Sequence, residues 1–194
     1  MPARDPESHA DARSEKLAAR VDSLLTLKGD EHVLDAGAGA GALAYALAPR
    51  VRDVIAVDIE PQPRDEAPSN VAFVEGDVTA LSFGQGEFDL VGAVMLLHHV
   101  KWPETAMAEL TRVTRLGGTL LVVDHVAPAD PLAALELNRV ERARDPSIAR
   151  ILSDADLRGL FEQNGLVVTR DELRDEREHD GVVGWYVLRK PRPG

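Results

Sequence analysis

The stretch VLDAGAGAG (residues 33–41) places three glycines at alternate positions directly behind a short apolar run. Glycine loops of this kind let a backbone come close to a ligand, and the ligand is often a phosphate. Asp35 stands just ahead of the first glycine, however, where a carboxylate would repel a phosphate. The stretch therefore predicts a site where the backbone contacts a ligand and where a nearby carboxylate makes the surroundings negatively charged.

Apolar runs and helical patterns alternate on both sides of this loop. Buried strands are expected at residues 31–36, 54–60, 71–77, 88–95 and 119–126. Helices are expected at 14–27, at 41–51 until Pro49 stops it, and at 103–114, where RLGG (115–118) ends it. Strands that alternate with helices at these distances predict β-α-β units and a largely parallel sheet.

The pattern changes after residue 127. It predicts a helix at 132–143, a helix from the N-cap Ser153 to Asn164 with Gly165 behind it, and strands at 166–173 and 182–190 around an acidic link. We expect one three-layer, doubly wound α/β domain over residues 1–194, with a mostly parallel seven-stranded sheet and an antiparallel last strand. Residues 1–13 are expected to be disordered, 14–28 to form the N-terminal helix, and 127–152 to form a helical insertion on the substrate side.

Composition excludes several classes of partner. The 33 acidic residues exceed the 22 basic ones, so the net charge of −11 disfavours non-specific binding to nucleic acid or to an anionic membrane. The chain has no cysteine and six histidines without a metal-ligand pattern, so we expect no metal. It lacks a signal-peptide pattern and any run near the ~18 apolar residues of a membrane helix, so we expect a cytoplasmic protein. A homodimer is left open.

Four features converge at the carboxyl ends of the predicted strands, where ligands bind in open α/β sheets. They are the glycine loop, the acids Asp58 and Glu60 that end the second strand, Asp77 after the third, and residues 93–99 after the fourth. The carboxylate of Asp58 has two oxygens that can accept both hydroxyls of a ribose.

The spacing of the glycines separates two kinds of ribose ligand. Gly37, Gly39 and Gly41 read G-x-G-x-G, whereas the dinucleotide fingerprint is G-x-G-x-x-G and lacks an acid just before the glycines. S-adenosylmethionine carries a ribose but has an ammonium and a sulfonium in place of phosphates, so it suits these negatively charged surroundings. A nicotinamide oxidoreductase stays an alternative.

Five segments, in order, resemble the motifs of the class I S-adenosylmethionine-dependent methyltransferases. VLDAGAGAG is similar to their first motif, VIAVDIE to their ribose strand, VEGDVTALSF to their adenine-side motif, FDLVGAVMLLHHV to their fourth-strand motif and RVTRLGGTLLVVD to the entry into their fifth strand. The resemblance covers about residues 24–126 and is strongest to the small-molecule group that includes quinone-biosynthesis C-methyltransferases.

The resemblance implies cofactor contacts at ten positions. Asp35, Ala36, Gly37 and Gly39 would surround the methionine part, with Ala93 and Val94 at its border; Asp58 would hold the ribose, Ile59 would pack on the adenine, Asp77 would accept from the adenine amino group, and Val78 would lie beside the ring. Two plainer interpretations remain open: Asp35 as a cap at the strand end, and Asp77 as a turn former.

The segment between strands two and three departs from the family pattern. Prolines at 61, 63 and 68 predict that the usual helix is shortened to a turn, which would leave the adenine side open. The segment before the first motif has no aromatic residue to fold over the cofactor, so a partner subunit or the substrate could complete the lid.

Three histidines are candidates for a catalytic base. His98 and His99 follow the fourth strand and His125 follows the fifth, near the position of the methyl group, where a neutral imidazole could take a proton from an acceptor. At most one of the adjacent pair is expected to face the site, and the other would be a packed or capping histidine.

The sequence thus predicts an enzyme that transfers the methyl group of S-adenosylmethionine to a small organic acceptor by direct in-line displacement, releasing S-adenosylhomocysteine. A protein that keeps the cofactor site but transfers nothing is the second hypothesis.

Overall fold

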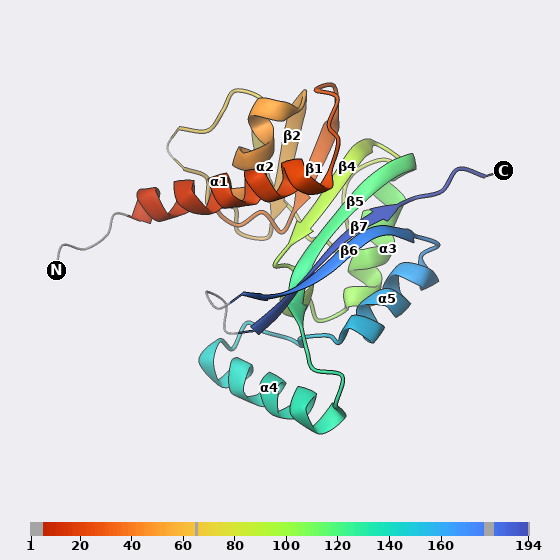
Figure 1. Cartoon of the computed structure of the whole chain (residues 1–194). Coiled ribbons are helices and arrows are strands. Elements are labelled where there is room, and N and C mark those ends of the chain that lie inside the picture. The colour runs from red at the N-terminus through yellow and green to blue at the C-terminus, as the bar shows by residue number, and fades with distance from the viewer. Residues whose placement is uncertain (1–5, 65, 177–180, 194) are drawn as a thin grey trace.

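The computed structural model describes residues 6–64, 66–176 and 181–193. Its seven strands form one sheet in the order β3-β2-β1-β4-β5-β7-β6 (Figure 1). The strands are β1 (His32–Ala36), β2 (Asp53–Asp58), β3 (Val71–Glu75), β4 (Phe88–Val94), β5 (Thr114–Val126), β6 (Val167–Glu176) and β7 (Gly181–Arg189). The first five pair in parallel, and β7 runs antiparallel to both of its neighbours. The predicted α/β fold class is confirmed.

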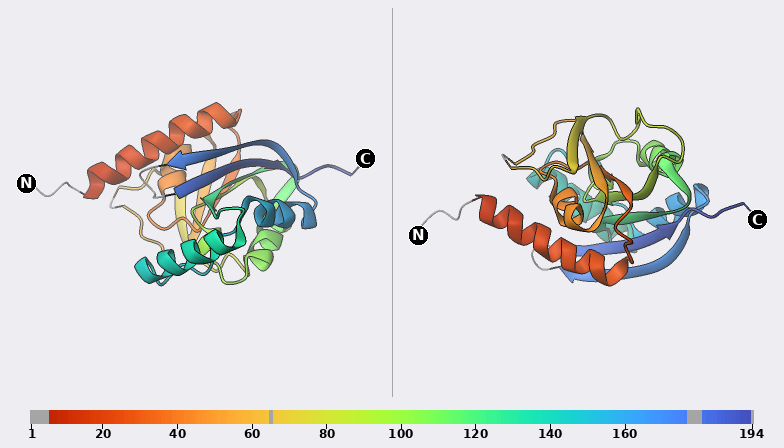
Figure 2. Two further views of the ribbon diagram at one scale, coloured as in Figure 1. Left: turned by 60° about the horizontal axis from the view of Figure 1, so that its bottom comes forward. Right: turned by 90° about the horizontal axis from the view of Figure 1, so that it is seen from above.

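Helices cover both faces of the sheet. On one face lie α1 (Pro6–Leu24), which runs along β6 and β7, and α2 (Ala42–Leu47), which continues into η1 (Ala48–Arg50) (Figure 2). On the other face lie α3 (Pro103–Val113) and α5 (Asp154–Gln163). The helix α4 (Pro131–Arg144) follows β5 and stands apart from the sheet (Figure 1). The short η2 (Leu97–His99) follows β4.

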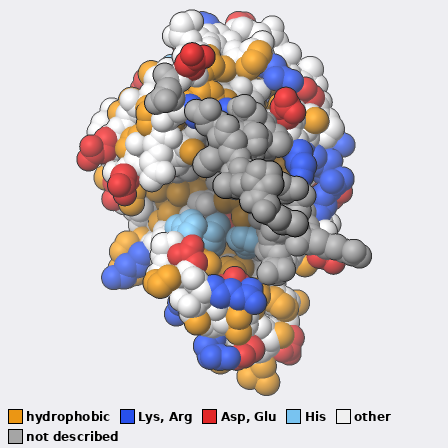
Figure 3. All heavy atoms as spheres, turned by 90° about the vertical axis from the view of Figure 1, so that its left-hand side faces the viewer, with side chains coloured by type: hydrophobic (Ala, Val, Ile, Leu, Met, Phe, Trp, Pro, Cys, Tyr) orange, Lys and Arg blue, Asp and Glu red, His pale blue; other side chains and the backbone are white. Residues whose placement is uncertain are grey.

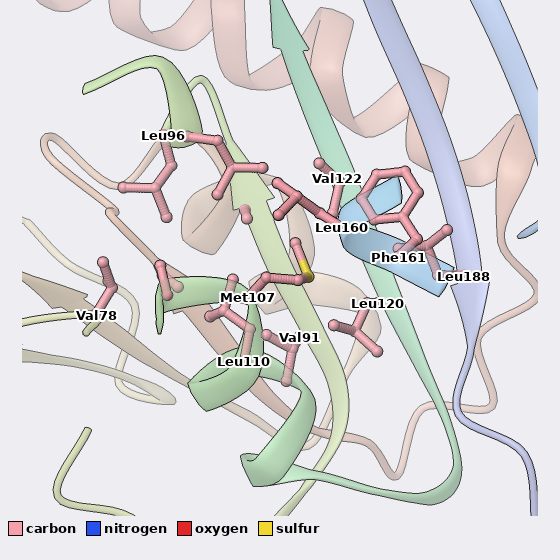
Figure 4. Packing of buried hydrophobic residues seen from close by; sticks show 14 of the residues in the cluster. Val78, Val91, Leu96, Met107, Leu110, Leu120, Val122, Leu160, Phe161 and Leu188 are labelled. Atoms are coloured by element: carbon pink, nitrogen blue, oxygen red, sulfur yellow. The ribbon is translucent and has the colours of Figure 1, made fainter. Parts of the chain in front are cut away.

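Side chains of β5 alternate between the two layers. Leu120 and Val122 pack with α3 and α5, and Figure 4 shows Val122 near Leu160 and Phe161. Leu121 and Val123 belong to the core under α1 and α2. This alternation follows from the two-residue period of a strand, and it explains why a strand covered on both faces reads as a continuous apolar run.

Two boundaries differ most from the sequence predictions. The helix α1 begins at Pro6 rather than Ser14, so residues 6–13, which were expected to be disordered, are helical, while residues 1–5 lie outside the described part. Proline at the first helical position is a start signal that needs no buried face.

The strand β5 begins at Thr114, five residues earlier than predicted, so the segment RLGG lies within the strand. The pairing of β4 with β5 shifts between Phe88 and Leu90, and Gly117 there has a φ of 75°. The two glycines therefore accommodate an irregularity in the strand, although α3 does end at Val113 as the pattern implied.

The connection between β2 and β3 contains no helix in its described residues, as the three prolines predicted. The strand β3 lies at the edge of the sheet, and without a helix over it its side chains are partly exposed. Within the described ranges, no helix has the length and apolar character needed to cross a bilayer.

Candidate functional site

The glycine loop is tied to the carboxyl end of β2. The backbone N–H groups of Gly37 and Ala38 both donate to the carbonyl of Val57, at 2.8 and 2.9 Å. Gly37, Gly39 and Gly41 have φ angles of 69°, 50° and 79°, a region that side chains with a Cβ rarely adopt. The loop is thus held in one shape beside the neighbouring strand.

Gly37 and Gly39 face different surroundings. A Cβ built on Gly37 would lie 2.4 Å from Cδ1 of Leu96, so packing alone requires glycine there. A Cβ built on Gly39 would meet no protein atom within 4 Å. Gly39 therefore leaves space that the protein does not fill, which is what a ligand in contact with the loop would need.

Substituting Gly39 by alanine tests whether that space holds the cofactor. We expect Gly39→Ala to weaken binding of S-adenosylhomocysteine at least tenfold, measured by calorimetry, because the new methyl group would occupy the ligand's space. Gly29→Ala is the matched control, because Gly29 also has a positive φ, 93°, and open space around its Cβ. Both variants should lose about 1–2 kcal/mol of stability through backbone strain. Equal affinities in the two variants would contradict the assignment.

Asp35 is buried under the loop, with 2% of its surface exposed. Its Oδ2 accepts the backbone N–H of Ala44, in the first turn of α2, at 2.9 Å. Burial raises the pKa of Asp35 to about 7; the Ala44 hydrogen bond opposes this rise and the charge of Asp58 adds to it. The carboxylate thus does cap the helix, and it places an ionisable group where a dinucleotide fold would bind phosphate.

Asp58 ends β2 and orders the backbone on both sides of it. Its Oδ2 accepts the N–H of Gly39 at 2.7 Å, and its Oδ1 accepts the N–H of Glu60 at 3.0 Å. Each carboxylate oxygen can accept a second hydrogen bond, so both oxygens remain able to bind a pair of ligand hydroxyls.

The next residues along this edge combine an exposed apolar side chain with a polar turn. Ile59 is 74% exposed, although isoleucine is one of the residue types most often buried, and it leaves an exposed apolar side chain next to Asp58. Asp77 forms a turn in which the N–H and hydroxyl of Thr79 donate to its Oδ1, and these bonds hold the pKa of Asp77 below its usual value. Val78 is buried in the core behind that turn.

Strand register brings the predicted cofactor positions to one edge. Ala36 pairs with Val57 on one side and with Ala93 on the other. The side chains of Ala36 and Ala93 are buried, whereas Val94 is half-buried. The two alanines therefore present only their backbone to this edge.

The three candidate histidines lie together. The ring centroid of His98 is 4.0 Å from that of His99 and 5.0 Å from that of His125. Figure 3 shows histidine side chains in a hollowed part of one face. His98 is buried, and His99 is exposed with its Nδ1 3.0 Å from the hydroxyl oxygen of Ser147. No group of three or more metal-ligating side chains occurs among the described residues.

The sequence interpretation missed Asp124, the buried partner of His98. Oδ1 of Asp124 lies 2.6 Å from Nδ1 of His98 and accepts the N–H of His125 at 2.7 Å. Its Oδ2 accepts the N–H of Leu97 at 2.6 Å. The signal available was an aspartate at the end of an apolar strand beside His125, but its partner is 26 residues away and becomes a neighbour only through the pairing of β4 with β5.

Comparison with known proteins gives consistent matches. The model of the family described as "Methyltransferase domain" matches residues 34–122. YcgJ of Bacillus subtilis, an uncharacterized methyltransferase, is 34% identical over 168 residues, covering 79% of this chain and 66% of the relative. The demethylmenaquinone methyltransferase of Renibacterium salmoninarum is 29% identical over 169 residues, covering 85% of this chain and 68% of the relative. The chain thus spans about two thirds of the length of these relatives.

A solved structure shares the fold over most of both chains. The crystal structure of BH2331 from Bacillus halodurans superposes with a TM-score of 0.82 at 24% identity, covering 90% of this chain and 99% of the other. At this identity the likeness concerns the fold.

Proposed function

Because the chain belongs to the class I S-adenosylmethionine-dependent methyltransferases, we propose that it transfers the cofactor's methyl group to a small organic acceptor by in-line displacement. The observation that carries the proposal is the carboxyl edge of β1 and β2. An open glycine loop, the buried acid Asp35 and the carboxylate of Asp58, which has acceptor capacity for a ribose diol, lie there side by side.

The residues at this edge fit S-adenosylmethionine. Gly39 leaves open space over the loop, Asp58 has acceptor capacity for a ribose diol, and Ile59 presents an exposed apolar surface suited to an adenine ring. Asp77 keeps one carboxylate oxygen outside its own turn, where it could accept from the adenine amino group. When bound, the cofactor supplies a methyl group on a positively charged sulfur.

The protein's part in such a transfer is chiefly positioning. Holding acceptor, methyl carbon and sulfur in line can contribute about 7–11 kcal/mol to lowering the barrier. The negative charge of ionised Asp35 attracts the positively charged methionine end of the cofactor and repels a phosphate. The N–H of Ala44, which could otherwise donate to a phosphate, already donates to Asp35. This argues against a nicotinamide dinucleotide at the same loop.

Incubation with methyl-labelled S-adenosylmethionine and a panel of small acceptors tests the proposal. We expect label in a small-molecule product, with one S-adenosylhomocysteine formed for each methyl group transferred. A chain that binds S-adenosylhomocysteine tightly but labels no acceptor would instead be a binding protein. The demethylmenaquinone methyltransferase among the relatives makes hydroquinones a sensible part of the panel.

A further inference from the structure

A buried histidine–aspartate pair lies after β4 and near the end of β5, at the edge of the sheet that carries the predicted cofactor positions, and neither residue is one of those positions. His98 is 5% exposed and Asp124 is 2% exposed. The carboxylate of Asp124 is oriented by the backbone N–H groups of Leu97 and His125 in addition to the ring of His98. A buried pair with this many fixed hydrogen bonds is held in a single geometry.

The pair determines which nitrogen of His98 can act as a base. A carboxylate can only accept hydrogen bonds, so the proton of the neutral imidazole lies on Nδ1 and the lone pair lies on Nε2. Among the described residues, Nε2 has no hydrogen-bond partner, and it is not one of the atoms fully shut off from solvent. Nε2 therefore keeps a lone pair that a water molecule or the hydroxyl of an acceptor can reach.

The surroundings of the pair indicate the kind of acceptor. His99 and His125 lie against His98, and His125 also lines a small cavity of about 30 Å³ between apolar side chains (Val126, Leu137, Ile148, Ile151 and Val182) and the carboxylate of Glu141.

The acids near the histidines have partners of their own. Glu141 pairs with Arg144 at 2.9 Å, and Oδ1 of Asp145 accepts from the hydroxyl of Ser147 at 2.6 Å. A largely apolar surface whose nearby acids already have partners favours an uncharged apolar acceptor over a cationic one.

We propose that His98 is the general base for a weakly acidic hydroxyl on an apolar ring, a phenol or hydroquinone, and that Asp124 is its positioning residue; the inference rests on the proposed function. The hydroxyl proton passes to Nε2 of His98 as an oxygen lone pair forms the new O–C bond. The methyl–sulfur bond breaks with its electron pair left on sulfur, and the imidazolium then returns its proton to water. A neutral amine needs no such base, because it already carries a nucleophilic lone pair.

Two substitutions of His98 separate catalysis from packing. His98→Asn puts an amide nitrogen near the place of Nδ1, so it keeps a donor for Asp124 but removes Nε2. His98→Gln puts an amide near the place of Nε2 but removes the Nδ1 donor. If His98 is the base, His98→Asn loses activity with near-normal stability. If its role is only structural, His98→Asn stays active and His98→Gln is the damaged variant.

The assay uses 2-naphthol and pentafluorophenol, which is already ionised at neutral pH, each with S-adenosylmethionine. We expect His98→Asn to lower kcat/KM for 2-naphthol by about 10²–10⁴ and to change that for pentafluorophenol little. Its residual rate with 2-naphthol should rise with pH until the naphthol itself ionises. Affinity for S-adenosylhomocysteine should not change. An equal loss with both phenols would overturn the assignment.

A second histidine–aspartate pair among the described residues provides a matched control. Nδ1 of His32 bonds to Asp53 at the amino end of the sheet, remote from the glycine loop. His32→Asn should leave both phenol rates unchanged. Asp124→Asn should lower kcat for 2-naphthol and shift the ring proton of His98 toward Nε2, seen in nitrogen NMR of labelled histidine.

Failure of the inference is distinguishable from failure of the proposed function. If the wild-type chain binds S-adenosylhomocysteine and methylates amines or thiols but neither phenol, the acceptor class proposed here is wrong and methyl transfer stands. If it binds no S-adenosylhomocysteine, the proposed function fails as well.

Discussion

Replacing Asp58 by alanine is expected to lower the affinity for S-adenosylhomocysteine by about 10²–10⁴. Two hydrogen bonds from ribose hydroxyls to a charged acceptor are lost, each worth about 1.5–3 kcal/mol. The anchor of Gly39 is lost with them, because the N–H of Gly39 donates to Oδ2 of Asp58. Calorimetric titration of the purified variant measures the effect. Asp58→Asn, which keeps one acceptor oxygen, should fall between the alanine variant and the wild type.

Asp53 lies at the other end of the same strand and serves as the control. Burial alone would raise the pKa of Asp53, but hydrogen bonds from His32 and Arg52 outweigh it and hold that pKa below its usual value. Asp53→Asn should therefore cost some stability and leave the affinity for S-adenosylhomocysteine unchanged. If Asp58→Ala binds as tightly as Asp53→Asn, Asp58 does not hold the ribose.

Asp35→Asn is expected to change stability and binding in opposite directions. The pKa of Asp35 is raised from 3.8 to about 7, so the folded chain binds more protons than the unfolded chain between these values. Stability from this group is fully present below about pH 4 and is lost as pH rises through 7. Asparagine does not ionise, so the variant keeps this stability at high pH. At pH 8 the free energy of unfolding of the variant should therefore exceed that of the wild type by about 2–4 kcal/mol.

Urea unfolding at a series of pH values checks this difference, which should vanish below about pH 4. The affinity for S-adenosylhomocysteine should change with pH in the opposite direction to stability. The affinity of the wild type for S-adenosylhomocysteine should increase as pH rises through 7, because the ionised carboxylate attracts the ligand's ammonium group, and the variant should bind weakly at every pH. A variant that loses stability at pH 8 and keeps its affinity would mean that Asp35 is a helix cap alone.

The elements that could be predicted from the sequence are those with strong local signals. The strands β1 to β4 begin and end within about two residues of the predicted bounds, because each is a short apolar run between turn residues. Ser153 caps α5 with its side chain on the N–H of Asp156, and Gly165 follows that helix with a φ of 66°, both as expected. The start of α1 and the irregular start of β5 were missed, because neither carries a periodic apolar signal.

The candidate site divides in the same way. The residues predicted to bind the cofactor do lie along one edge, because parallel strands bring their carboxyl ends together, but their binding role stays a prediction. The hydrogen bond from the N–H of Ala44 to Asp35 could not be predicted, because it forms only once the chain turns from the glycine loop into α2. The partnership of His98 with Asp124 depends on the pairing of β4 with β5 and on the turn at Met95, whose φ of 55° is unusual for a residue with a side chain.

The central claim is that this edge of the sheet binds a ribose with a positively charged amino-acid tail and excludes a pyrophosphate. Calorimetric titration of the wild-type chain at about pH 8 with S-adenosylhomocysteine and, separately, with NADH tests it most directly, because Asp35 is then ionised. The account predicts saturable heat with S-adenosylhomocysteine and none with NADH. Saturable binding of NADH, or no heat with S-adenosylhomocysteine, would contradict it.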